Sequence, residues 1–332
     1  MNRILYLDLI RIFACLMIIA IHAPVPDSNI DGYILYANSA ICSSGVGLFV
    51  MVSGALLLPV KMPTLSFIKK RLGKIVIPTF LWSIFYMFVQ FQDGNVCFAD
   101  IFSSLLSFPF SPQYNSVFWF IYMLTGLYLL APIISPWLKC TSQKGILFYL
   151  MIWGITLLYP LIRSCVGVNV TTTGILYYFS GFMGFFLLGY YLKNYVNIVP
   201  TWICFILLFL PLAITLLLKL YHINIDFFDL FWYLSIFVPM MSVGWFLLIK
   251  KVNCLIRYQR ALTLLSNCCF GIYLVHIFIM RYVVWQWDFV RNAGNAQIGV
   301  VMLLTFVGSF LVTWLISFIP GAEYIVGYKH KR

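Results

Sequence analysis

Ile4 to Pro24 reads ILYLDLIRIFACLMIIAIHAP, a stretch apolar enough and long enough to cross a bilayer as a helix. Arg11 and His22 are embedded in it, eleven residues apart. An α-helix turns about 100° per residue, so both side chains fall on one face, about 16 Å apart along the axis. A charged group and a titratable group on one face of a membrane helix are costly to keep there. The usual reason is a cavity that holds water or substrate.

The composition of the 332-residue chain is that of a polytopic membrane protein. Hydrophobic residues make up 63% of it and charged residues only 9%, whereas a soluble domain carries about 25% charge. We predict an all-α bundle of about ten transmembrane helices, forming one integral-membrane domain over residues 1–332. The first span carries Asp8 and Arg11 and has no small-residue cleavage pattern, so we expect it not to be a cleaved signal peptide. The expected spans are 4–23, 39–58, 75–92, 117–135, 146–165, 175–192, 200–219, 229–249, 263–284 and 297–319.

The net charge of +12 is explained by orientation in the membrane. If the N-terminus is cytoplasmic, most Lys and Arg side chains fall inside, including the dense run from Lys61 to Lys74, and most acidic side chains fall outside. This is the positive-inside pattern, and it predicts that both termini are cytoplasmic. Basic residues placed in this way touch anionic lipid headgroups, and they require no nucleic acid as a partner.

The nine cysteines are scattered, without a CxxC pair or the spacing of metal ligands. Most of them lie within expected spans, where a free thiol behaves as a small apolar group. We therefore expect no zinc site, no disulfide framework and no metal cofactor.

Arg11 and His22 are the first candidates for catalysis. A neutral His22 can accept a proton near physiological pH, as a general base must. The alternative is a histidine hydrogen-bonded at the outer interface. Arg11 has its own alternative, which is to extend towards cytoplasmic headgroups.

Other polar residues could bind substrates. Arg71, Lys74 and Lys70 could hold an anionic cofactor at the cytoplasmic mouth, or they could be ordinary solvated cations. His276 could face the cavity or be a satisfied buried histidine. Further candidates for binding a sugar are Asp226, Asp229 and Trp119, although acids and aromatic residues are also common at membrane interfaces.

Five motifs follow one another along the chain. They are the Arg11-x10-His22 pair, GVGLFVMVSG (Gly45–Gly54), FIKKRLGKIVIP (Phe67–Pro78), VFWFIYMLTGLYLLAP (Val117–Pro132) and SNCCFGIYLVH (Ser266–His276). In this order, and over nearly the whole length, they resemble the acyltransferase-3 family of membrane proteins, which includes O-antigen and nodulation-factor O-acetyltransferases.

The resemblance implies an acyl donor, usually acetyl-CoA, reached from the cytoplasm, and a sugar hydroxyl presented outside a bacterial cytoplasmic (inner) membrane. The acceptor would belong to a cell-surface polysaccharide or its lipid-linked precursor. Arg71 and Lys74, with Arg11, would hold the phosphates of CoA, and His22 would take the proton of the hydroxyl. The family often has a second arginine where this chain has Lys74, which keeps the charge but loses the bidentate fork. Direct transfer and an acyl-enzyme both remain open.

Two functions from other classes compete with acyl transfer. A transporter or flippase of a lipid-linked glycan would move its substrate without acyl chemistry, but no internal repeat typical of transporters is visible. A non-catalytic membrane scaffold would leave the embedded Arg11 and His22 unexplained.

Overall fold

A computed structural model describes residues 3–26, 38, 40–94, 98–110, 116–167, 177–197, 199–221, 230–252 and 256–330, and all regular structure within them is helical. This confirms the predicted fold class. The helices of the first half are α1 (Leu5–His22), α3 (Ser44–Leu57), α4 (Thr64–Gln92), α5 (Phe98–Ser107), α6 (Trp119–Cys140), α7 (Gln143–Thr156) and α8 (Tyr159–Val166). Those of the second half are α9 (Met183–Tyr195), α10 (Thr201–Leu220), α12 (Phe237–Lys250), α13 (Gln259–Tyr282), α14 (Asp288–Arg291) and α15 (Gln297–Ile316).

Eight helical stretches in the described part of the chain are long and apolar enough to cross a membrane. They match eight of the ten expected spans. The other two expected spans, 175–192 and 229–249, overlap the shorter helices α9 and α12, of 13 and 14 residues. A straight crossing needs about 20 residues, so these two segments do not cross as single complete helices.

Non-helical backbone accounts for the short length of α9 and α12. Gly181, just before α9, has a φ of +106°, a conformation that ends helical backbone on that side. Before α12, the Ser235 amide bonds to the Trp232 carbonyl at 2.9 Å, as part of a run of turns. Irregular backbone within a membrane protein is tolerated where protein or a cavity surrounds it.

Two prolines within expected spans have different effects on the helices. Pro211 lies inside the continuous helix α10, whereas helix α7 ends at Thr156 and α8 begins at Tyr159, with Pro160 as its second residue. The basic segment before residue 75 is itself helical: α4 begins at Thr64 and runs without a break through the expected span 75–92.

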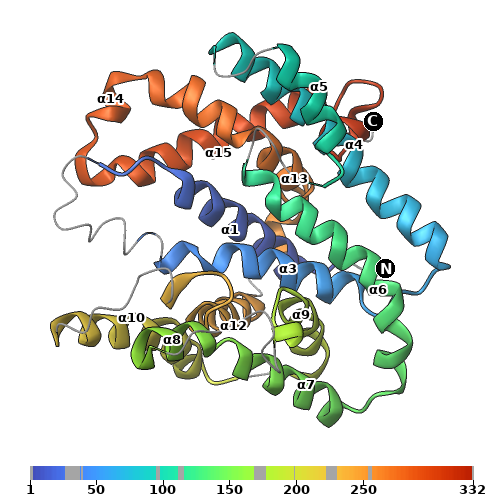
Figure 1. Ribbon diagram of the computed structural model, residues 1–332, viewed down its shortest axis with the longest axis vertical. Helices are drawn as coiled ribbons and strands as arrows, with labels where there is room; N and C mark the ends of the chain where they lie inside the picture. The colour runs from blue at the N-terminus through green and yellow to red at the C-terminus, as the bar shows by residue number, and fades with distance from the viewer. Residues whose placement is uncertain are drawn as a thin grey trace.

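Helices α1 and α13 lie side by side, parallel and in register. Contacts between them advance in step along both helices: from Asp8 and Arg11 to Ser266, from Cys15 to Cys269, and from His22 to His276. Figure 1 shows α1 and α3 in the middle of the bundle, with α13 and α15 on one side and α9 and α12 on the other. The Arg11 and His22 side chains are therefore carried by a central helix.

Helices α3 and α9 touch backbone to backbone. A Cβ atom added at Gly54 would lie 1.8 Å from the Phe186 carbonyl oxygen, and one added at Gly189 would lie 1.9 Å from that of Met51. Small residues allow membrane helices to approach this closely. The short helix α9 is thus held firmly against the core by α3.

We predict that Gly54→Ala destabilises the protein while Gly126→Ala does not. The new methyl group at residue 54 must force α3 and α9 apart, at a cost of about 3 kcal/mol or more. A Cβ at Gly126, in α6, meets nothing within 4 Å, and alanine favours a helix over glycine by about 1 kcal/mol. Apparent melting temperatures in detergent should fall for the first variant only; equal values would contradict the close α3–α9 contact.

Candidate active site

A narrow cavity lies beside His22, at the end of α1. About 310 Å³ of space, part of it open to solvent, lies within its walls, but the centre of a water molecule fits within only about 10 Å³, room for roughly one water. Four separated parts of the chain besides α1 supply its walls. The lining residues are Ile18, Ile21, His22, Cys42, Val46, Val117, Trp119, Phe120, Tyr233 and Tyr273.

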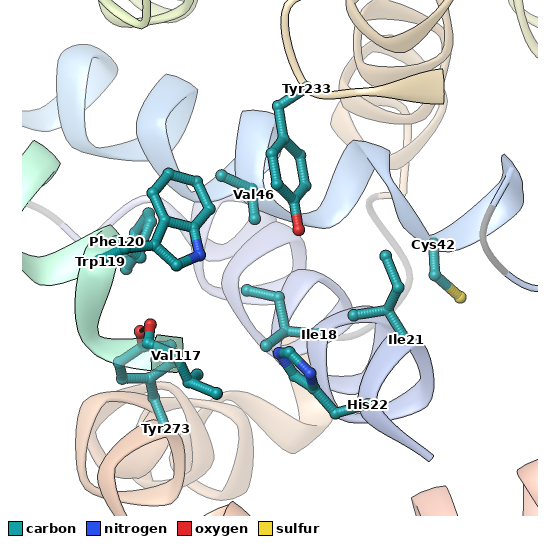
Figure 2. A pocket seen from close by; sticks show the side chains of 10 residues that line it. All are labelled: Ile18, Ile21, His22, Cys42, Val46, Val117, Trp119, Phe120, Tyr233 and Tyr273. Atoms are coloured by element: carbon teal, nitrogen blue, oxygen red, sulfur yellow. Dashed lines mark hydrogen bonds between the residues drawn. The ribbon is translucent and has the colours of Figure 1, made fainter. Parts of the chain in front are cut away.

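Three polar groups face this cavity. Figure 2 shows the His22 ring, the indole nitrogen of Trp119 and the hydroxyl of Tyr233 directed toward one shared space, while the Cys42 sulfur points away from it. Cys42 donates instead to the Asn38 side-chain oxygen at 3.5 Å. The cavity thus combines one group that can take up a proton with two that can hydrogen-bond to a polar ligand.

An aromatic wall closes one side of the cavity. The Trp119 ring lies 5.2 Å from Tyr233 and 5.6 Å from Phe182, between ring centres. Phe182 and Tyr233 come from the non-helical backbone before α9 and α12. The two interrupted helices therefore place aromatic faces where a flat ring or a sugar could stack.

His276 lies behind His22, away from the cavity. Its side chain is 0% exposed, its ring centre is 5.6 Å from that of His22, and it is not among the lining residues. Its Nδ1 donates to the Tyr273 carbonyl oxygen at 2.6 Å. Its Nε2 has no hydrogen-bond partner.

The tyrosine hydroxyls near these histidines hold the helices together. Tyr273 donates to the Val117 carbonyl, which ties α13 to the start of α6. Tyr86 donates to the Leu274 carbonyl at 3.0 Å and accepts from the Phe278 amide at 3.2 Å, which ties α4 to α13. Both hydroxyls are occupied by backbone groups, so we assign them no chemistry.

Arg11 is fixed by a polar network between α1 and α13. Its guanidinium donates to the Ser266 hydroxyl at 3.2 Å, and that hydroxyl donates to the Asp8 carboxylate at 2.7 Å. Asp8 is buried, and it forms an ion pair with Arg3 at 2.6 Å. Because Arg3 already neutralises Asp8, the positive charge of Arg11 remains available to an anion.

Arg71, on α4, and Arg11, on α1, both place their positive charge near one tyrosine hydroxyl. The hydroxyl of buried Tyr128 interacts with Ser53 and with the positive charges of both arginines. The Arg71 Nε is buried and has no hydrogen-bond partner. We call these four residues, Arg11, Ser53, Arg71 and Tyr128, the arginine site.

Lys70 and Lys74 do not share this position. Both side chains are exposed, one helical turn apart on α4, whereas Arg71 is half-buried. Helical geometry turns Arg71 about 100° away from Lys70. Of the three residues predicted to bind an anionic cofactor, the structure brings only Arg71 together with Arg11.

The His22 cavity and the arginine site lie about three helical turns apart, roughly 16 Å along α1. Phe49 lies one turn from Ser53 on α3, and Phe120 lines the cavity. The centres of these two rings are 6.0 Å apart. Aromatic side chains therefore fill space between the two sites.

Some site residues could not be placed or were not foreseen. Asp226 and Asp229 lie outside the described residues. Tyr128 and Ser266 occur within motifs noted in the sequence, but nothing in their spacing marks them as neighbours of Arg11. Tyr233 follows the two acids closely in the sequence, but nothing in its position there marks it as a residue of the cavity.

The sequence model of the acyltransferase-3 family, described as an acyltransferase domain, matches residues 4–317. No match was found among curated proteins or among solved structures. The family match spans both the His22 cavity and the arginine site, together with all eight candidate membrane spans. The chain therefore belongs to the acyltransferase-3 family, and it is a multi-pass membrane acyltransferase.

Proposed function

We propose that this protein transfers an acetyl group from acetyl-CoA to a sugar hydroxyl, with His22 as the general base. The acceptor is a cell-surface polysaccharide or its lipid-linked precursor, and the membrane is the bacterial cytoplasmic membrane, as the motif resemblance to the enterobacterial common antigen O-acetyltransferase suggests. Residues 1–332 act as one integral-membrane domain. The observation that carries the proposal is the position of His22, in a cavity with an aromatic wall and in line with the arginine site on α1.

The arginine site suits the phosphates of the donor. Two guanidinium groups lie near a neutral tyrosine, and within the described residues neither forms an ion pair with a carboxylate. Guanidinium forks bind phosphate oxygens by charge-assisted hydrogen bonds. A phosphate here would also give the buried Arg71 Nε the partner it lacks.

The His22 cavity suits the acceptor. Sugar rings stack on aromatic faces such as Trp119 and Tyr233, whose polar atoms can bond to hydroxyl groups. Asp226 and Asp229 are retained as candidates for orienting the sugar, since they directly precede the segment that carries Tyr233.

The proposed reaction balances with His22 alone as the proton carrier. The sugar oxygen attacks the thioester carbonyl carbon, so that a carbon–oxygen bond forms and the carbon–sulfur bond breaks. His22 takes the hydroxyl proton during the attack and passes it to the sulfur of the departing CoA. The products are the acetyl ester and free CoA, and no acyl-enzyme is needed.

The distance between the two sites sets how the donor must bind. With its phosphates at the arginine site, acetyl-CoA must extend its arm about 16 Å to bring the thioester to His22. Phe49 and Phe120 fill part of that route. Donor binding must therefore displace their rings.

We predict that His22→Ala abolishes acetyl transfer and His330→Ala does not. Loss of a general base typically lowers a rate about 10²–10⁴-fold. His330 packs against Phe318 near the C-terminus, so it is a matched control. The measurement is transfer of radiolabel from acetyl-CoA to the glycan fraction of membranes that carry each protein. Transfer by His22→Ala at the wild-type rate would refute the proposed base, and a wild type that moves glycan without labelling it would indicate a flippase.

We predict that Arg71→Ala raises the KM for acetyl-CoA about tenfold or more, because a charge-assisted hydrogen bond is worth about 1.5–3 kcal/mol. Lys70→Ala removes the same charge from an exposed side chain one residue away, and solvent and salt screen such a charge. Its effect should stay within about threefold. An equal rise for both variants would show that only the overall charge of this segment matters.

A further inference from the structure

The Nε2 atom of His276 is buried without a hydrogen-bond partner, and packing alone gives no reason for a polar atom at this position. A carbonyl oxygen can only accept a hydrogen bond, so the His276 Nδ1, 2.6 Å from the Tyr273 carbonyl, must carry the proton. In a neutral imidazole the Nε2 is then an acceptor. This Nε2 has no partner, and the side chain is 0% exposed. An unsatisfied buried acceptor is costly, by about 1–3 kcal/mol.

His22 is the donor best placed to satisfy this acceptor. The hydroxyls of Tyr273, on α13, and Tyr86, on α4, also lie near α13, but both already donate to backbone carbonyls. Two imidazole rings joined edge to edge by an N–H···N bond of about 2.9 Å have centres roughly 5 Å apart. The observed separation is 5.6 Å, with the rings inclined at 43°. A small rotation of the half-buried His22 side chain would close the bond.

We propose that His276 is a positioning residue for His22: its Nε2 accepts a hydrogen bond from one ring nitrogen of His22, which directs the other nitrogen at the acceptor hydroxyl. The inference rests on the proposed function and deepens it. The sequence suggested that His276 binds substrate, but the side chain does not line the cavity. It reaches the substrate only through His22.

The pair also accounts for how a positive charge can form here. When His22 takes the hydroxyl proton it becomes an imidazolium beside an apolar wall, where an unbonded charge is unfavourable. Within the described residues, no carboxylate bonds to either imidazole ring. The neutral Nε2 of His276 accepts a charge-assisted hydrogen bond from that imidazolium. His276 therefore stabilises the protonated base without binding substrate.

The test compares three substitutions at residue 276. His276→Asn keeps a donor for the Tyr273 carbonyl but removes the acceptor next to His22. His276→Gln places an amide oxygen near the position of Nε2, so it can restore that acceptor. His276→Phe fills the space with no polar atom. Each protein is measured for acetyl transfer to membrane glycan over a range of acetyl-CoA concentrations, after its insertion and melting temperature are checked.

We expect the kcat of His276→Asn and His276→Phe to fall about tenfold to a hundredfold, less than the roughly 10²–10⁴-fold attributed to a general base. The KM for acetyl-CoA should stay within about twofold, and His276→Gln should recover most of the lost kcat. Wild-type kcat in His276→Asn would overturn the proposal, as would equal loss in Asn and Gln variants that are both folded. These outcomes presuppose transfer by the wild type; its absence would instead contradict the proposed function.

A second measurement needs no variant at residue 276. The chain has only four histidines, so ¹⁵N-histidine labelling of wild-type protein in lipid bilayers gives a simple solid-state NMR spectrum. We expect a through-bond ¹⁵N–¹⁵N coupling between His22 and His276, assigned by its disappearance in His22→Ala. A spectrum in which both rings are resolved and uncoupled would overturn the hydrogen bond.

Discussion

The parallel register of α1 and α13 is the constraint on which both sites depend. Asp8 and Arg11 meet Ser266 at one end of this helix pair, and His22 meets His276 at the other. A shift of one residue would turn each side chain by about 100° and part both contacts at once. The network around Asp8 therefore fixes the proposed anion site and also sets the height and direction of the proposed base. The register of α1 against α13 therefore aligns both sites, which lie about three helical turns apart.

The segments before α9 and α12 add the aromatic wall to the cavity beside His22. If the segment of Tyr233 or that of Phe182 were a continuous helix, it would present the regular surface of a helix to the cavity. The turns before α12 and α9 instead place single aromatic rings beside Trp119. The close contact at Gly54 and Gly189 holds the remaining short helix against the core. Stability is thus supplied by backbone-to-backbone packing away from the cavity, while the cavity wall comes from backbone that is not helical.

Much of the fold could be predicted from hydropathy, because a bilayer demands long apolar helices and Arg11 and His22 lie at a helical spacing on the first of them. The predicted helix lengths were wrong at two spans. Gly181 and the turns after Trp232 shorten the helices there, although the composition of both segments is that of complete spans. Beyond α1, the candidates predicted from the sequence included Trp119, which lines the cavity, and Arg71, which belongs to the arginine site, but the sequence did not separate them from the other candidates. Arg71 is half-buried and Lys70 is exposed, because the two side chains leave α4 in different directions. His276 lies behind the His22 ring and does not line the cavity. Both distinctions arise from packing between distant segments, which a linear pattern does not encode.

The contact between Phe49 and Phe120 has a consequence for the membrane as well as for the reaction. In the proposed reaction the two substrates come from opposite sides of the bilayer, so the path between them has the connectivity of a channel, with one mouth for the donor and another for the acceptor. Ions and protons cross wherever water forms a continuous file through such a path. Two apposed phenyl rings offer no hydrogen bonds and leave little room for water, so they interrupt that file. If the donor reaches His22 along the proposed route, the side chains that it displaces are the same ones that would keep the permeability barrier intact without ligands.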